Sequence, residues 1–165
     1  MPDPTDPMDE QWLRQVLALA VANVADGGGP FAAVVVRDGG ELATGSNRVT
    51  RDQDPSAHAE VVAIRTACAK IGDFSLAGAT LYASCEPCPM CLATSLWARL
   101  DRVVYAADRD DAAQAGFDDR VFYELFGAVR ARDHADWPMP VQERRLAGST
   151  TPFDAWLAKD DRTDY

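Results

Sequence analysis

The sequence has few basic residues and no long hydrophobic run, and both shortages exclude classes of protein. Its 165 residues include 16 Lys and Arg against 26 Asp and Glu, for a formal net charge of -10. A surface of that sign repels phosphate backbones, so we expect no nucleic-acid partner. The apolar run at residues 31–36 ends at Arg37, well short of the roughly 20 residues that span a bilayer. We therefore also expect no membrane span.

The N-terminal residues lack the basic and apolar regions of a secretory signal. Residues 1–8 are rich in Asp and Pro, and we expect them to be a flexible lead-in to a cytoplasmic protein. Cysteines are few, and three of the four crowd together at Cys85, Cys88 and Cys91. Without a secretory signal, metal binding is a better interpretation of this cluster than two disulfides.

The length of the chain and its 47% hydrophobic residues predict one domain over residues 1–165. Apolar side chains recur every three or four residues in the first predicted helix, and Asp38-Gly39-Gly40 is typical of a hairpin turn. A loop with a short helical turn is expected at residues 108–119. The other predicted elements are helices at residues 10–25, 57–71, 88–99, 121–126 and 153–158, strands at 31–37, 41–45, 80–84, 102–106 and 138–146, and a polar loop at 47–56.

Two short motifs combine residue types that bind metals. His58-Ala59-Glu60 stands at the head of one predicted helix, and Pro87-Cys88-Pro89-Met90-Cys91 stands at the head of another. Cysteines three apart on a helix share a face, and the free amide groups of a helix start favour their thiolate forms. One His and two Cys leave the fourth position of zinc open for water, as in catalytic sites. The sequence therefore predicts one zinc ion held by His58, Cys88 and Cys91.

Glu60 is the predicted catalytic residue. Zinc lowers the pKa of its bound water toward roughly 7, and a nearby carboxylate can accept that proton and pass it to a departing nitrogen. Residues two apart on a regular helix point to different sides, so we expect Glu60 to address the water at an angle. Taken singly, His58 is more often a hydrogen-bonded histidine at a helix start, and each cysteine a buried small hydrophobe. Together they indicate a hydrolytic metal site.

The two motifs resemble the H-x-E and P-C-x-x-C signature of zinc nucleobase and nucleoside deaminases. The similarity covers nearly the whole chain and points to the bacterial guanine deaminases. It implies zinc-dependent hydrolysis of guanine to xanthine and ammonia, with one zinc ion per subunit. Besides the two motifs, the resemblance is carried by residues 29–31, Asn47, and residues 54–61, 84–87, 97–99, 111–119 and 165.

The same resemblance implies a fold and an assembly. The fold would be α/β, a three-layer αβα sandwich with a central mixed five-stranded sheet. The assembly would be a homodimer in which C-terminal segments, about residues 147–165, are exchanged, with Tyr165 as a lid residue over the partner's site. Residues 127–140 depart from the family pattern, and this leaves the lid and the size limit of the substrate open.

Five more residues are implied as substrate contacts. The Asn47 side chain and the Ala59 backbone would hold the purine, and Asp119 would read or protonate its amino side. Phe31 and Trp97 would line its faces. On composition alone, the hydrophobic core is the better interpretation of both aromatic residues. Asn47 could merely shape a turn, and Asp119 belongs to an acidic stretch that is ordinarily solvated.

The residues leave several related functions open. Guanosine, cytosine or an aminotriazine could replace guanine, because small changes in one pocket select among flat amino-heterocycles. A tRNA adenosine deaminase shares the zinc signature; the acidic balance opposes it, although a basic patch at residues 130–132 or 144–145 could survive. A non-catalytic zinc-stabilised module would depend on metal for folding, and Glu60 beside a three-ligand zinc argues against it.

Overall fold

The computed structural model describes residues 7–127 and residue 150. The chain divides into two units, Met1–Tyr123 and Glu124–Tyr165, and the first carries the candidate site. The helices and strands, in chain order, are α1 (Pro7–Ala25), β1 (Ala32–Arg37), β2 (Gly40–Ser46), α2 (Val49–Asp52), α3 (Ala59–Ile71), β3 (Ala79–Cys85), α4 (Pro89–Trp97), β4 (Arg102–Ala107), α5 (Arg109–Gln114) and α6 (Arg120–Gly127).

The four strands of the first unit form one mixed sheet in the order β2-β1-β3-β4. β1 is antiparallel to both of its neighbours, whereas β3 and β4 are parallel and are connected through α4. The ends of β2, β3 and β4 therefore lie at the same edge of the sheet as the start of β1. Residues next to these strand ends come together there although they are far apart in the sequence.

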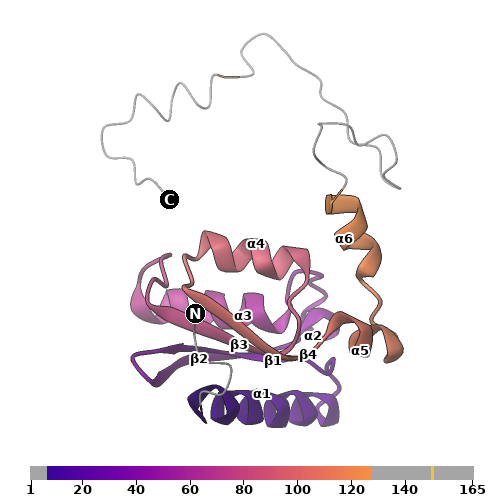
Figure 1. The fold of residues 1–165 in the computed structure, drawn as a ribbon, viewed down its shortest axis with the longest axis horizontal. Helices are drawn as coiled ribbons and strands as arrows, with labels where there is room; N and C mark the ends of the chain where they lie inside the picture. Colours follow the sequence, from indigo (N-terminus) through magenta and orange to yellow (C-terminus); the bar gives the residue numbers. More distant parts are fainter. Residues whose placement is uncertain (1–6, 128–149, 151–165) are drawn as a thin grey trace. The chain divides into compact units, whose positions relative to one another are not determined.

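Helices cover both faces of the sheet, α1 on one side and α3 with α4 on the other (Figure 1). Successive side chains of a strand point to opposite faces, so the buried strand β1 contributes to two hydrophobic cores. Val34 and Val36 pack in the core on the α1 side, and Ala33 and Val35 pack in the core on the α3 side. The expected α/β fold with a mixed sheet is confirmed. The expected fifth strand, at residues 138–146, lies outside the described residues.

Most predicted helices and strands up to residue 127 are confirmed, with ends that shift by at most three residues. The polar segment at residues 47–56 is different, because it contains the short helix α2, which Arg48 and Asp52 support as an ion pair one turn apart. α1 begins at Pro7, so the last two residues of the expected lead-in are helical. Proline suits a first helical turn, where its missing N–H is not needed. The helix expected at residues 153–158 lies outside the described part of the chain.

The helix α3 lies unusually close to the sheet at Gly45 of β2. A Cβ atom on Gly45 would lie 2.2 Å from the carbonyl oxygen of Ala59 and 2.5 Å from the backbone nitrogen of Ala63. Both contacts are with backbone atoms, which cannot rotate away as a side chain can. Only glycine therefore allows this approach, and the approach fixes the first turn of α3 against the end of β2.

A buried polar contact joins α1 to the face of the sheet that α1 covers, opposite to α3. The Asp9 carboxylate is 8% exposed and accepts hydrogen bonds from the Tyr82 hydroxyl at 2.7 Å and from Arg102 Nη1 at 2.9 Å. The second Arg102 nitrogen, Nη2, contacts the other Asp9 oxygen, which makes the ion pair bidentate. Burial raises the pKa of Asp9, but the hydrogen bonds from Arg102 and Tyr82 outweigh it and lower the pKa overall.

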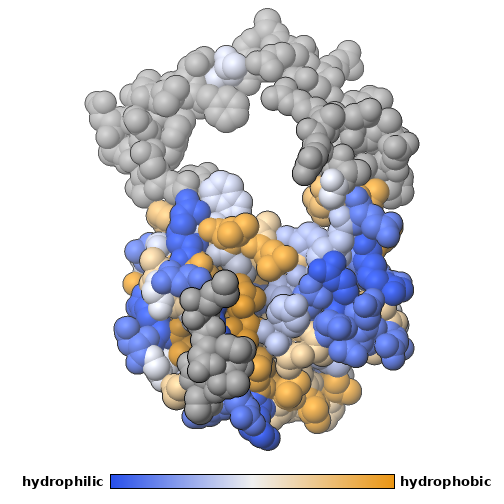
Figure 2. All heavy atoms as spheres, in the orientation of Figure 1, coloured by the Kyte–Doolittle hydropathy of each residue, from blue (hydrophilic) through white to orange (hydrophobic). Residues whose placement is uncertain are grey.

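The surface of the first unit is uneven in polarity. Hydrophobic residues gather over α4 and hydrophilic residues gather over α5 (Figure 2). The exposed hydrophobic side chains of α4 are Met90, Leu92, Leu96 and Trp97. Within the described residues, no helix combines the length and the hydrophobicity that crossing a membrane requires.

Replacing Gly45 with Ala should destabilise the protein. The added methyl group meets fixed backbone atoms, so we expect the free energy of unfolding to fall by about 2 kcal/mol or more, measured by urea denaturation with circular dichroism. Gly40→Ala in the same strand is the matched control, because a Cβ there lies 3.7 Å from the nearest atom. Equal losses at the two positions would contradict the close-packing explanation.

Asp9 should make stability depend on pH in the acidic range. Its pKa is lowered in the folded protein, so its contribution is fully present above the unfolded value of about 3.9 and is lost as the pH falls through the folded value. Wild type should exceed Asp9→Asn in unfolding free energy by about 1 to 3 kcal/mol at pH 7. Urea titrations at pH 7 and below pH 4 measure whether the difference shrinks. A difference independent of pH would contradict this role of the carboxylate.

Candidate active site

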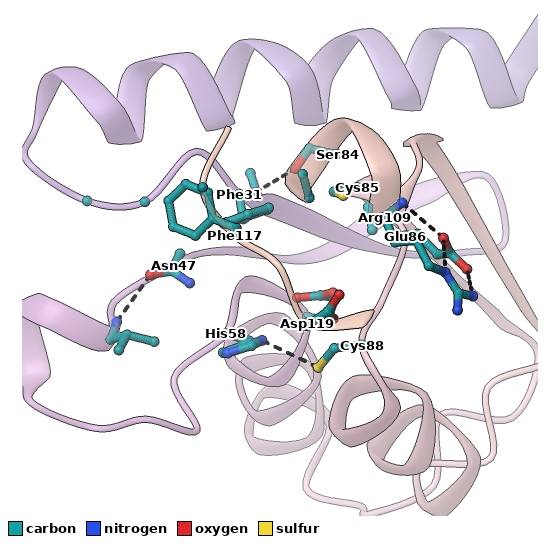
Figure 3. Close-up of a pocket in the computed structure, with 18 of the residues that line it drawn as sticks. Phe31, Asn47, His58, Ser84, Cys85, Glu86, Cys88, Arg109, Phe117 and Asp119 are labelled. Carbon is teal, nitrogen blue, oxygen red and sulfur yellow. Dashed lines mark hydrogen bonds and ion pairs between the residues drawn. The ribbon is translucent and has the colours of Figure 1, made fainter. Parts of the chain in front are cut away.

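A cavity of about 600 Å³ opens at the edge of the sheet where β3 and β4 end (Figure 3). Its walls come from segments that precede β1, follow β2, begin α3, follow β3 and lie beyond β4. The sheet topology thus explains why segments far apart in sequence line one space. The lining residues are Gly27 to Gly29, Phe31, Ala32, Asn47, Val49, Thr50, His58, Glu60, Ala83 to Glu86, Cys88, Arg109, Ala112 and Gly116 to Asp119.

His58, Cys88 and Cys91 form a compact group that could hold a metal ion. The three pairwise distances, between Cys88 Sγ and His58 Nδ1, between Cys91 Sγ and His58 Nδ1 and between the two sulfurs, are all 3.6 Å. A tetrahedral zinc ion with Zn–S bonds of about 2.3 Å and a Zn–N bond of about 2.0 Å separates its ligand atoms by about 3.5 to 3.8 Å. The group therefore has the size and the chemistry of three zinc ligands.

The starts of two helices orient this group. His58 is the N-cap of α3 and Cys88 is the N-cap of α4, and both have extended backbone angles without a capping hydrogen bond from the side chain. Their side chains instead turn toward each other (Figure 3). Cys91 follows one turn into α4 and is fully buried. The positive ends of two helix dipoles therefore face the sulfurs, an arrangement that favours thiolates.

The charges of the group suit a soft divalent cation. A hydrogen bond with the Cys91 thiol, aided by His58, lowers the pKa of Cys88 to about 4 although burial opposes the shift. The interaction with Cys88 and burial raise the pKa of Cys91. The Cys88 sulfur also raises the pKa of His58. The site thus stabilises a negative sulfur, the form of cysteine that binds zinc.

Glu60 lies in the same cavity and is 7% exposed. Its carboxyl interacts with the Cys91 thiol, and burial raises the pKa of this carboxyl. The sequence predicted that Glu60 and His58 would point to different sides of a helix. That rule applies to two helical residues, whereas His58 is an N-cap with φ -66° and ψ 153°. Both side chains therefore reach the cavity from the start of α3.

Two phenylalanines form an aromatic wall of the cavity. The rings of Phe31 and Phe117 meet edge to face, with their centroids 5.0 Å apart. Phe31 was predicted as a substrate contact, and the fold brings it to the cavity. The buried hydroxyl of Ser84 accepts a hydrogen bond from Ala32 N at 3.1 Å, which fixes the start of β1 directly after Phe31. The wall is therefore held by the sheet itself.

Asn47 and Asp119, which the family resemblance implies as substrate contacts, also line the cavity. The position of Asn47 is held from α1, because the buried Asn23 amide donates to Asn47 O at 2.9 Å and to Gly29 O at 2.8 Å. The side chain of Asp119 lies toward the same space as His58 (Figure 3). Burial, and secondarily the Cys88 sulfur, raises the pKa of Asp119.

Two other predicted contacts, Trp97 and Ala59, are not among the described residues that line this cavity. Trp97, at the end of α4, is 61% exposed, and the Arg99 guanidinium lies 5.7 Å from its ring centroid. Ala59 is fully buried beneath Gly45, although its backbone belongs to the first turn of α3. Tyr165 lies outside the described residues. Substrate binding by these three residues stays a prediction.

A network at the rim of the cavity was not predicted from the sequence. Glu86 and Arg109 form an ion pair, and the Arg109 guanidinium carbon lies 3.5 Å from the ring centroid of Tyr123. Glu86 directly precedes the Pro-Cys motif, and Arg109 is the second residue after β4, at the same edge of the sheet. Both positions are visible in the sequence, but only the parallel pairing of β3 with β4 indicates that they meet.

This site and fold are those of a zinc-binding deaminase. The family model described as the cytidine and deoxycytidylate deaminase zinc-binding region matches residues 6–107, more than half of the chain. The protein belongs to this family. The matched region contains His58, Glu60, Cys88 and Cys91, and the His/Cys/Cys group fits one zinc ion per subunit.

Within the family, the chain is similar to guanine deaminases. It is 43% identical to guanine deaminase of Bacillus subtilis over 157 residues, covering 94% of this chain and 98% of that protein. The X-ray structure of guanine deaminase from Bacillus subtilis superposes with a TM-score of 0.88 at 44% identity, with coverages of 94% and 98%. Guanine deaminase from Nitrosomonas europaea matches with a TM-score of 0.64 at 39% identity, with coverages of 68% and 65%.

A second kind of relative acts on RNA. The tRNA-specific adenosine deaminase of Bacillus subtilis is 36% identical over 151 residues, which cover 92% of this chain and 91% of that protein. The zinc motifs alone therefore do not distinguish a guanine deaminase from a tRNA adenosine deaminase. Other residues of the cavity have to determine the substrate.

Proposed function

We propose that the protein hydrolyses guanine to xanthine and ammonia with one zinc ion per subunit. The observation that carries the proposal is the buried carboxyl of Glu60 beside the His58, Cys88 and Cys91 group, in a cavity with an aromatic wall. The likeness to guanine deaminases over 94% of the chain supports the choice of guanine.

His58, Cys88 and Cys91 would hold the zinc ion. When bound there, zinc lowers the pKa of a coordinated water toward about 7, so that water can attack at neutral pH. Three protein ligands leave room for that water, and the burial of Cys91 and Glu60 keeps bulk solvent from the ligands' far side. The protein then has to bring the base and a proton carrier to the same point.

Glu60 is the proposed proton carrier. Its carboxyl would accept a proton from the attacking water and deliver it to the exocyclic nitrogen on C2 of guanine, which leaves as ammonia. A new C2–O bond forms, the bond between C2 and the exocyclic nitrogen breaks, the second hydrogen of the water passes to ring nitrogen N3, and xanthine is the product. One group can perform both transfers because the water attacks, and the amino group leaves, at the same carbon.

The base would lie against the aromatic wall. Phe31 offers an apolar ring for stacking, and Phe117 supports that ring from its edge. The Asn47 amide and a backbone N–H at Ala59 would bind the polar edge of the purine, and Asp119 would contact the amino side. These contacts are proposals that rest on the cavity lining and on the family resemblance.

An RNA-editing function is the main alternative. The identity of 36% to a tRNA-specific adenosine deaminase favours it, whereas the net charge of -10 disfavours a polyanionic substrate. Guanosine, cytosine and aminotriazines are other amino-heterocycles that the same groups could accept. A non-catalytic zinc module would have no use for a buried carboxyl beside the ligands.

The assembly and the outer parts of the domain remain proposals that rest on the resemblance. We propose one deaminase domain over residues 1–165 with a fifth strand, and a homodimer that exchanges residues 147–165, with Tyr165 as a lid. The exposed apolar strip on α4, which includes Trp97, is a surface that a second copy could cover. Sedimentation analysis of the purified chain tests the dimer. The cytoplasmic location stays a prediction.

The first test of the function is the release of ammonia from a panel of substrates. Zinc-loaded protein should release ammonia from guanine, with xanthine formed, in preference to guanosine, cytosine, adenine and an aminotriazine. Release from another ring would keep the zinc chemistry and change the assigned substrate. No release from any of them, together with inosine formation in tRNA, would replace the proposal by RNA editing.

The role of Glu60 is tested by separating metal binding from turnover. Glu60→Ala and Glu60→Gln should keep one zinc ion per subunit but lower kcat at least about a hundredfold, because they remove the proton carrier. Cys91→Ser is the matched contrast and should lose zinc as well, measured by elemental analysis. Full activity in both Glu60 variants would show that another group moves the proton.

A further inference from the structure

The loop that connects β3 to α4 is held by two residues from beyond β4. Arg109 binds the Glu86 carboxylate through Nε at 3.0 Å, through its backbone N–H at 3.1 Å and through Nη2. Glu86 N in turn donates to Ala107 O at 2.8 Å. The carboxylate at the end of β3 is therefore fixed in a bidentate fork, the geometry that makes an Arg–carboxylate pair specific in direction.

Tyr123 holds the next residue of the same loop. Its hydroxyl donates to Pro87 O at 2.9 Å, while its ring packs against the Arg109 guanidinium at 3.5 Å. Pro87 itself is fully buried. The Pro87 carbonyl belongs to the peptide group that joins Pro87 to Cys88, so the hydrogen bond fixes the plane of the peptide from which Cys88 begins.

That peptide plane decides where the Cys88 sulfur points. Cys88 is the N-cap of α4, with φ -64° and ψ 167°, and no side-chain capping bond holds it. The triangle of His58, Cys88 and Cys91 has edges of 3.6 Å, so a small rotation of this peptide would move one corner out of ligand range. Of the other two ligands, Cys91 is fixed within α4, and His58 is fixed at the start of α3, which packs on the sheet.

We infer that Tyr123, supported by Arg109, is a positioning residue that orients Cys88 for metal binding. The inference rests on the metal ligands assigned in the proposed function. Tyr123 and Arg109 lie beyond residues 6–107, so the matched deaminase region does not include them. Groups that fix a metal ligand from behind typically change metal affinity by about 10- to 100-fold when they are removed.

Tyr123→Phe isolates this effect, because it deletes only the hydroxyl that binds Pro87 O and keeps the ring on Arg109. We expect the Kd for zinc, measured on the full chain by competition with a chromogenic chelator at pH 7, to rise about tenfold. The thiolate-to-metal absorption band of the Co²⁺-substituted protein should also shift or weaken. Arg109→Lys keeps the charge but loses the fork, and it should raise the Kd in the same direction.

Tyr105→Phe is the matched control, since Tyr105 lies on β4 with its side chain 44% exposed and should leave zinc affinity unchanged. Urea denaturation after chelation distinguishes positioning from a loss of folding, which should be small for Tyr123→Phe. A zinc Kd within twofold of wild type in both Tyr123→Phe and Arg109→Lys would overturn the inference, as would an absence of zinc binding by wild type. Zinc binding by wild type without guanine turnover would overturn only the proposed function.

Discussion

The site depends on the backbone contact between α3 and β2 at Gly45. Because the first turn of α3 lies directly on the strand, His58 and Glu60 enter the cavity from a rigid support. A wider spacing would move both side chains away from the cysteines, which come from another helix start. Catalytic groups need placement within a fraction of an ångström, and a helix packed on a sheet supplies this better than a loop.

Local sequence was enough to predict the metal half of the site. Ligand types, helix starts and strand ends depend on neighbours in the chain, so His58, Cys88 and Cys91 could be identified without the fold. Contacts between residues far apart in the sequence could not be predicted in this way. Arg109 meets Glu86 across 23 residues, and Asn23 holds Asn47 across 24, with no periodicity to indicate either contact. The short helix α2 was missed for another reason: its ion pair joins Arg48 and Asp52, four residues apart, but a single exposed pair is a weak signal for a helix in a polar segment.

The cavity divides into a part shared by the family and a part outside the matched region. Residues 6–107 contain the metal group and Glu60, whereas Phe117 and Asp119 come from the segment that follows. The tRNA-specific adenosine deaminase of Bacillus subtilis is similar over 92% of the chain, well beyond residues 6–107. Phe117 and Asp119 line the cavity without belonging to the metal group, so these positions can differ without altering the hydrolytic groups.

The stacked pair of Arg109 and Tyr123 belongs to a segment that contacts both the metal-ligand loop and the cavity, and this has a thermodynamic consequence. The short stretch that contacts Pro87 also carries Phe117 and Asp119 to the cavity, so one segment serves both the ligand loop and the substrate side. Coupling between two binding sites is reciprocal: if a bound purine orders this stretch, it strengthens retention of the metal by the same factor by which the metal strengthens binding of the purine. The enzyme would then hold its cofactor most firmly while it is working.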